Sequence, residues 1–137
     1  QDAARLARLL ADPERPALLV FAGKAHPHDR AGQAMIRELY GYSLRPEFAG
    51  RLFVVEGYDL DLARRLVRGC DIWLNTPEYP FEASGTSGMK SAANGGVNVA
   101  VLDGWWAEGF DGENGFGIEP VSDAPHDERN RLEGLQL

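Results

Sequence analysis

Four short apolar runs, separated by segments of helix length, restrict the fold of this chain more than any other feature. The runs lie within residues 17–22, 51–56, 71–75 and 97–102. All four are predicted strands, and the continuous apolar runs at 17–22 and 51–56 are typical of strands that are buried on both faces. Residues 29–42 and 59–68, between the runs, have the apolar spacing of helices. Alternating strands and helices predict an α/β fold with a Rossmann-like parallel sheet flanked by helices.

The rest of the chain divides into three kinds of segment. Residues 3–11 are predicted to be helical, and another helix is expected from residue 127 onward. Residues 105–117 read as a long loop, with a short strand possible at 116–119, because aromatic and glycine residues dominate there. Residues 12–16 and 120–127 are linker-like. We expect one partial domain over residues 1–137.

Charge and cysteine content exclude some classes of protein. The formal net charge of −7 argues against nonspecific binding to nucleic acid, which depends on clustered Lys and Arg. No segment approaches the roughly 18 apolar residues of a membrane-spanning helix, so we expect no membrane association. The one cysteine, Cys70, excludes an internal disulfide and fits a reducing compartment such as the cytoplasm.

The segment from Glu82 to Gly96 follows the predicted strand 71–75 and reads as a tight turn that opens a helix. Its residues Ser84, Thr86 and Ser87 are of types that cap helix N-termini, and Gly95-Gly96 is a plausible end. Spacing further predicts which face of this helix packs closely, since small or flexible residues recur at i, i+3, i+4 and i+7. That set comprises Met89, Ala92, Ala93 and Gly96.

Lys90 lies off that stripe, on the face that it shares with Thr86 and Ser87. Helical side chains lean toward the N-terminus, so the ammonium is expected over the first turn, where free backbone N–H groups bind anions. An amine beside an anion-binding turn suits a phosphorylated aldehyde. The alternative from spacing alone is a solvated surface lysine. A nucleotide P-loop fits worse, because Met89 stands where that motif needs Gly.

Three segments together resemble one family. Glu82–Lys90, followed by Ala93-Asn94-Gly95, resembles the pyridoxal-phosphate lysine segment of the α-glucan phosphorylases. Phe21–Pro27 resembles an upstream strand-to-loop segment of that family, and Leu102–Glu108 with Asn114-Gly115 resembles its short, bacterial-type branch. The resemblance runs from about residue 15 to about residue 131. It implies a piece of the C-terminal domain of a GT-B-type glycosyltransferase, with the N-terminal domain absent.

The resemblance assigns the cofactor to four residues. It implies that Lys90 holds pyridoxal 5'-phosphate as a covalent aldimine. Thr86 and Ser87 match positions whose backbone N–H groups reach the cofactor phosphate, and simple helix capping is the alternative role. Tyr58 matches a tyrosine beside the cofactor, although Gly57 stands where the family often has Asn.

Substrate binding is assigned to the residues before the helix. Glu82, Ser84 and Gly85 match the segment that hydrogen-bonds the hydroxyls of the transferred glucose. A carboxylate and exposed amides suit such a ligand, because each hydroxyl needs both an acceptor and a donor. The implied reaction is reversible phosphorolysis of α-1,4-glucan to glucose 1-phosphate, by a protein that is usually a homodimer.

The family's phosphate pocket also uses an Arg-x-x-x-Tyr-Lys type of motif, which this sequence lacks. We therefore expect the chain alone to be inactive and to bind the cofactor weakly or not at all. Two other functions stay open: a nucleotide-sugar glycosyltransferase resembling glycogen synthase, and a non-catalytic module that binds glucan or phosphate. No metal site is expected, because the histidines have no recurring spacing with acids or cysteine.

The roles of four further residues are open. Lys24 could bind phosphate or pair with an acid, and His26 reads as a residue that positions its loop. Trp105 and Trp106 could stack on sugar, but packing beneath the loop is the better interpretation.

Overall fold

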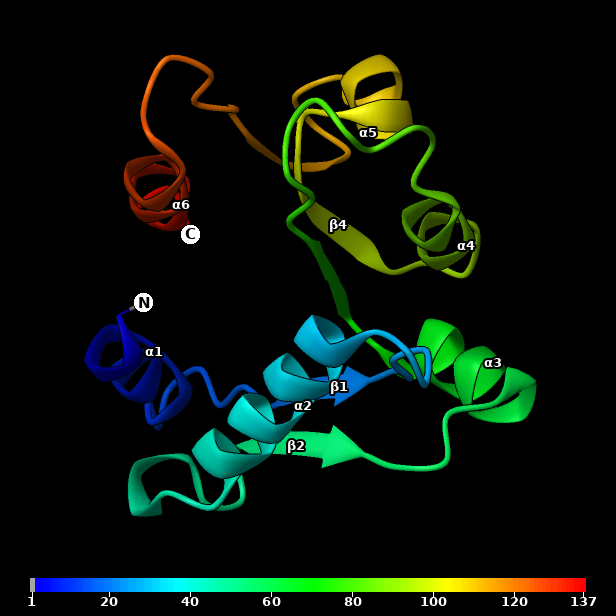
Figure 1. Cartoon of the computed structure of the whole chain (residues 1–137). Coiled ribbons are helices and arrows are strands. Elements are labelled where there is room, and N and C mark those ends of the chain that lie inside the picture. Colours follow the sequence, from blue (N-terminus) through cyan, green and yellow to red (C-terminus); the bar gives the residue numbers. More distant parts are fainter. Residues whose placement is uncertain (1) are drawn as a thin grey trace. The chain divides into compact units, whose positions relative to one another are not determined.

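A computed structural model describes residues 2–137 of the chain. The contacts divide it into two compact units, a first that ends at Leu60 and a second from Asp61 to Leu137. Both units combine helices with parallel strands (Figure 1). The prediction of an α/β, Rossmann-like fold is therefore confirmed.

Unit 1, the part up to Leu60, is built on two parallel strands. Strand β1 (Leu19–Ala22) pairs in parallel with β2 (Leu52–Val55), from Leu19 beside Leu52 to Ala22 beside Val55. Helix α2 (Arg30–Ser43) connects the two strands and packs on β2. Helix α1 (Ala3–Leu10) precedes β1, and the short 3-10 helix η1 (Pro46–Phe48) precedes β2.

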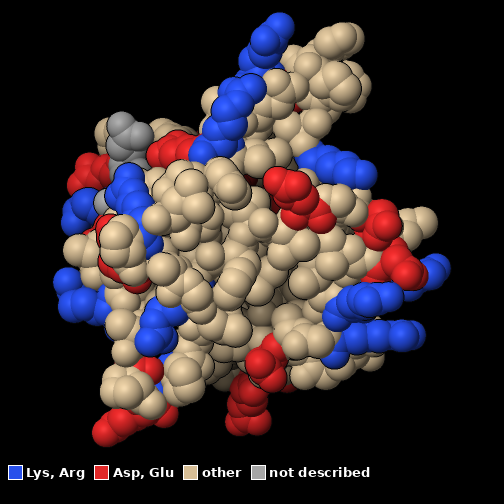
Figure 2. Space-filling model, turned by 90° about the horizontal axis from the view of Figure 1, so that it is seen from below, with Lys and Arg blue, Asp and Glu red and all other residues tan. Residues whose placement is uncertain are grey.

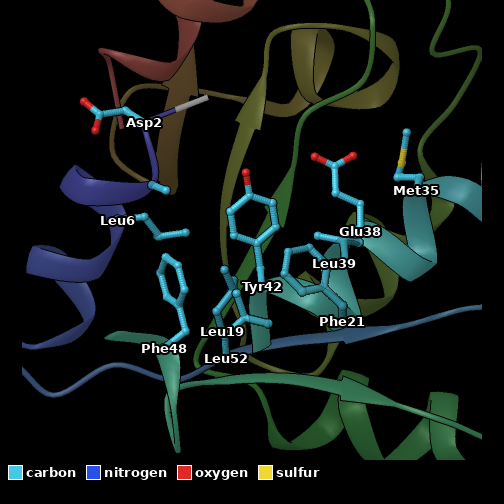
Figure 3. A pocket seen from close by; sticks show the side chains of 11 residues that line it. Asp2, Leu6, Leu19, Phe21, Met35, Glu38, Leu39, Tyr42, Phe48 and Leu52 are labelled. Atoms are coloured by element: carbon cyan, nitrogen blue, oxygen red, sulfur yellow. The ribbon is translucent and has the colours of Figure 1, made fainter. Parts of the chain in front are cut away.

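The core of unit 1 forms where α1, η1 and β2 meet. Leu10, Phe48 and Leu52 are buried there, and Phe48 is fully shielded from solvent. Partly buried Leu6 and Tyr42 pack against this cluster. Beside it lies a hollow of about 290 Å³ (Figure 3). Phe48 therefore joins the N-terminal helix to the strands of its unit.

Unit 2, from Asp61 onward, is built on three parallel strands in the order β3-β4-β5. The strands are β3 (Ile72–Asn75), β4 (Val97–Val101) and β5 (Gly115–Ile118). Four helices accompany them: α3 (Leu60–Gly69), α4 (Thr86–Ala93), α5 (Gly104–Gly109) and α6 (His126–Gly134). The buried residues of this unit include Ala100, Val101, Trp106 and Ile118.

The sheet of unit 2 has two different faces. Helices α4 and α5 pack on β4, and Asn98 donates from Nδ2 to the Gly88 carbonyl of α4 at 3.3 Å. On the opposite face Ile72, Leu74 and Phe116 are between 43% and 64% exposed. The packed helices therefore cover one face only. The strands predicted to be buried on both faces, 17–22 and 51–56, lie in unit 1, and that prediction is wrong, since the paired residues Val20 of β1 and Phe53 of β2 are 44% and 42% exposed.

The predicted loop is partly wrong, whereas most of the predicted linker residues lie outside helices and strands. The expected loop at 105–117 is wrong at its start, because α5 occupies Gly104–Gly109 and the Asp103 side chain accepts a hydrogen bond from the first helical amide. Residues 12–16 and 120–125 do lie outside helices and strands, and α6 begins at His126.

The charges on the surface and the lengths of the helices bear on possible partners. On the face seen in Figure 2, basic and acidic side chains are interspersed. That face carries no extended basic patch. Between residues 2 and 137, no helix combines the length and apolarity needed to cross a bilayer.

Candidate functional site

The turn before α4 ends on a glycine that starts the helix. Gly85 is the N-cap residue, and its φ of 82° and ψ of 45° lie in the left-handed region that favours glycine. No side chain caps this helix, so the prediction that Ser84, Thr86 or Ser87 would do so is wrong. Among the described residues, no acceptor binds the backbone amides of Thr86 and Ser87. The first turn of α4 therefore presents open N–H groups.

Lys90 lies one helical turn after Thr86 on α4 and is exposed. Within the described part of the chain its amine forms no hydrogen bond or ion pair, and only its carbonyl is engaged, by Asn94 Nδ2 at 2.8 Å. No interaction with another described residue has to be broken for this side chain to reach a ligand. The helix thus carries a free amine and open amides one turn apart.

Helix α4 approaches the sheet along a face that spacing did not predict. Gly88 and Ser91 are its buried residues, whereas Met89 is 39% exposed and Ala92 and Ala93 are exposed. A Cβ atom on Gly88 would lie 2.7 Å from Asn98 Oδ1 and 2.9 Å from Trp105 Nε1. The prediction that Met89, Ala92 and Ala93 form the packed face was wrong, because α4 comes closest to Asn98 and Trp105 at Gly88, where there is no room for a side chain.

Residues 82–85 are fixed against the start of α5. The Glu82 amide donates to Asp103 Oδ2 at 3.0 Å, and the Trp105 amide donates to the Ser84 carbonyl at 2.8 Å. The carboxylate of Glu82 lies beside the N-cap of α4, since its Oε1 is 3.0 Å from where a Cβ on Gly85 would stand. The structure therefore brings five predicted site residues onto one turn: Glu82, Ser84, Gly85, Thr86 and Ser87.

Sequence reasoning missed the contribution of Asp103 and Trp105 to this turn. The available signal was the position of Asp103-Gly104 directly after a strand, at the sheet edge where ligands of parallel sheets gather. Trp106 is 2% exposed and donates from Nε1 to the Phe116 carbonyl at 3.3 Å, which confirms its packing role. Trp105 is half-buried, with its ring against Gly85, Gly88 and Gly109.

Three other predicted positions belong to unit 1. Tyr58 follows β2 and is half-buried, and its place beside a cofactor stays a prediction. Lys24 and His26 are exposed in the loop after β1. His26 Nδ1 accepts from the His28 amide at 3.2 Å, which supports its interpretation as a loop-positioning residue. For Lys24 the described residues provide no acidic partner.

Other places where a ligand could bind hold different chemistry. The hollow in unit 1 is lined mainly by aliphatic and aromatic side chains, among them Leu19, Leu39 and Phe48, with Asp2 and Glu38 at its edge (Figure 3). None of the predicted site residues lines it. Over residues 2–137 no group of three or more His, Cys, Asp or Glu side chains is placed to hold a metal ion.

The residues of the α4 turn fit a phosphorylated aldehyde. Open amides at a helix N-terminus bind a phosphate group, and the positive φ of Gly85 lets the backbone turn without a side chain beside them. The free amine of Lys90, four residues after Thr86, suits the aldehyde. The turn thus supplies both kinds of group that such a ligand needs.

Comparison with known proteins gives one consistent result. The chain is 47% identical over 135 residues to the maltodextrin phosphorylase of Thermococcus litoralis, and 50% identical over 131 residues to the glycogen phosphorylase of Mycobacterium bovis. These matches cover 98% and 96% of this chain. The chain is homologous to a segment of the glycogen and maltodextrin phosphorylases. The glycogen phosphorylase of Aquifex aeolicus is likewise 50% identical, over 115 residues and 84% of this chain.

The family resemblance predicted from the sequence is therefore confirmed. The chain spans 16%, 15% and 17% of the length of these three phosphorylases, in the order given above. No protein-family model matches the chain. What the comparison establishes is the relationship of this segment to phosphorylases, and the whole protein's activity, substrates and partners are proposals.

Proposed function

We propose that this chain is the cofactor-binding part of an α-glucan phosphorylase. The complete protein would transfer glucosyl units reversibly between α-1,4-glucan and phosphate, with glucose 1-phosphate as the product. The observation that carries the proposal is the free amine of Lys90 one turn after the open amides of α4. The identity of 47–50% to proteins named as phosphorylases, along nearly the whole chain, supports it.

In this proposal α4 and its turn hold pyridoxal 5'-phosphate. The amine of Lys90 binds the cofactor covalently, and the amides of Thr86 and Ser87 bind its phosphate. When bound, the cofactor supplies a phosphate group that exchanges a proton with the substrate phosphate. The chain's own contribution is electrostatic, since open amides at a helix N-terminus stabilise clustered negative charge without having to reorganise.

The turn before α4 would bind the transferred glucose. Glu82 offers carboxylate oxygens as acceptors, and the backbone of Ser84 and Gly85 borders the same turn. Because sugar hydroxyls donate and accept at once, acceptors and amide donors on adjoining positions can fix the orientation of a ring. Cofactor groups and sugar groups would then be neighbours along one continuous backbone segment.

We also propose a compartment and an oligomeric state for the complete protein. We assign it to the cytoplasm, in keeping with its one cysteine, and expect a homodimer. The chain by itself would not catalyse phosphorolysis, because it corresponds to only 15–17% of the phosphorylases it matches. A nucleotide-sugar glycosyltransferase is not favoured, since a nucleotide donor needs no reactive amine after the turn.

The test uses the complete polypeptide with maltodextrin and phosphate, and measures release of glucose 1-phosphate. Lys90→Arg keeps the positive charge but cannot bind an aldehyde covalently, so activity should fall at least about a thousandfold. Met35→Ala, a change at an exposed residue of unit 1, serves as the control and should leave the rate unchanged. Wild-type protein without phosphorolysis, or a fully active Lys90→Arg variant, would overturn the proposal.

A further inference from the structure

The carboxylate of Asp103 connects two segments that lie far apart in the sequence. Its Oδ2 accepts a hydrogen bond from the Glu82 amide at 3.0 Å, and its Oδ1 accepts one from the Gly104 amide at 2.9 Å. The first bond spans 21 residues and the second caps α5. Hydrogen bonds to an ionised acceptor are stronger than those between neutral groups. Asp103 therefore ties the segment that begins at Glu82 to the end of β4.

Further contacts hold the same segment in the same place. The Trp105 amide donates to the Ser84 carbonyl at 2.8 Å. Gly104 has a φ of 53°, and a Cβ there would lie 2.8 Å from the Ser84 carbonyl oxygen and 3.0 Å from Glu82 Cγ. The start of α5 thus approaches residues 82–84 as closely as glycine allows. These contacts fix the backbone from which the Glu82 side chain extends.

We propose that Asp103 is a positioning residue that holds the Glu82–Gly85 segment in the geometry needed to bind the transferred glucose. This role rests on the proposed function, because it concerns the groups assigned there to the sugar. Asp103 acts through the backbone of Glu82 and need not touch the substrate. Groups that orient a ligand must be held to within a fraction of an ångström, so a loosened segment should weaken sugar binding.

The chain offers a variant that separates this role from helix capping. Asparagine caps helices as well as aspartate does, so Asp103→Asn can keep the bond to the Gly104 amide. Its second carboxamide atom is an N–H donor, which cannot accept from the Glu82 amide. Asp111→Asn is the matched control, because Asp111 Oδ1 also accepts two amides, those of Glu113 and Asn114 at 2.9 Å, but these are local and exposed.

The first measurement is amide hydrogen exchange, which does not depend on activity. In the complete protein, Asp103→Asn should make the Glu82 amide exchange at least about tenfold faster, while the amides of β4 keep their protection. Asp111→Asn should leave Glu82 unchanged. If Glu82 exchanges at the wild-type rate in Asp103→Asn, the link to Asp103 is disproved.

The second measurement is the KM for glucose 1-phosphate in the direction of glucan synthesis. Loss of one charged hydrogen bond should raise the KM in Asp103→Asn about tenfold, with bound pyridoxal phosphate and kcat much less affected. An unchanged KM, or an equal rise in Asp111→Asn, would overturn the positioning role alone. Wild-type protein without affinity for glucose 1-phosphate would overturn the proposed function as well. If Asp103→Asn fails to fold, Gly104→Ala displaces the same segment and must raise the KM.

Discussion

The hollow of unit 1 and the turn of unit 2 contrast in shape and in chemistry. The hollow encloses about 290 Å³ between apolar side chains, and one of its two carboxylates, that of Asp2, already accepts the Arg5 amide at 2.8 Å (Figure 3). The turn from Glu82 to Lys90 does not line this hollow, and it presents open amides and an unpaired amine among the described residues. Concavity is a common guide to binding sites. We propose that unused hydrogen-bonding groups are the better guide in this chain.

Different interactions stabilise each of the two regions. Around the hollow, stability comes from burial of large side chains, above all Phe48. Around the turn it comes from close backbone approach at Gly88 and Gly104, where an added Cβ would lie within 3.0 Å of its neighbours. Substitutions in the first region should therefore affect folding alone, and those in the second should affect folding and function.

The largest effect on stability is expected from Phe48→Ala. Removal of a fully buried phenylalanine should cost unit 1 about 3–5 kcal/mol. All three tryptophans, Trp73, Trp105 and Trp106, belong to unit 2, so their fluorescence in urea reports on that unit, while circular dichroism reports on both. We expect a shifted transition by circular dichroism only. An equal shift of the transition measured by tryptophan fluorescence would show that Phe48 stabilises unit 2 as well, contrary to this prediction.

A smaller loss of stability is expected from Gly88→Ala. The added methyl group would meet Asn98 Oδ1 and Trp105 Nε1, and overpacking of this kind costs about 1–3 kcal/mol. Tryptophan fluorescence in urea should show the loss, and the complete protein should bind less pyridoxal phosphate. Gly69→Ala is the matched control, because a Cβ at Gly69 meets no atom within 4 Å. Equal stability and equal cofactor content in the two variants would show that the close contact of α4 with Asn98 and Trp105 is not required.

The smallest effect is expected from Met35→Ala at the edge of the hollow. Met35 is 63% exposed, so its removal should change the free energy of unfolding by no more than about 0.5 kcal/mol. Cofactor content and activity of the complete protein should also stay at the wild-type level. A loss of activity in this variant would give the hollow a functional role that the account denies.

The sequence predicted the order of strands and helices well, because apolar runs and helical spacing are local properties. It failed where tertiary contacts decide. Helix α5 was missed because it is only six residues long and begins and ends on glycine, and because its formation depends on capping by Asp103 and burial of Trp106. The packed face of α4 was wrongly assigned because spacing gives a helix its faces but does not say which one meets β4.

The local part of the candidate site could be predicted from the sequence, and its long-range contact could not. The succession from Glu82 to Lys90 could be read directly, because one turn and one helix contain it. The hydrogen bond from Glu82 to Asp103 could not, since 21 residues separate the partners and only the folded sheet edge brings them together. Sequence alone therefore indicated which groups belong to the turn, and the structure added what holds the turn in place.

We propose above all that the amine of Lys90 binds a phosphorylated aldehyde, and the sequence offers an internal control. The chain has two lysines, Lys24 and Lys90, and both are exposed. The complete protein, loaded with pyridoxal phosphate and reduced with borohydride, can be digested and analysed by peptide mass spectrometry. We expect the reduced adduct on the Lys90 peptide and unmodified Lys24. Equal modification of both lysines, or an unmodified Lys90, would contradict this proposal.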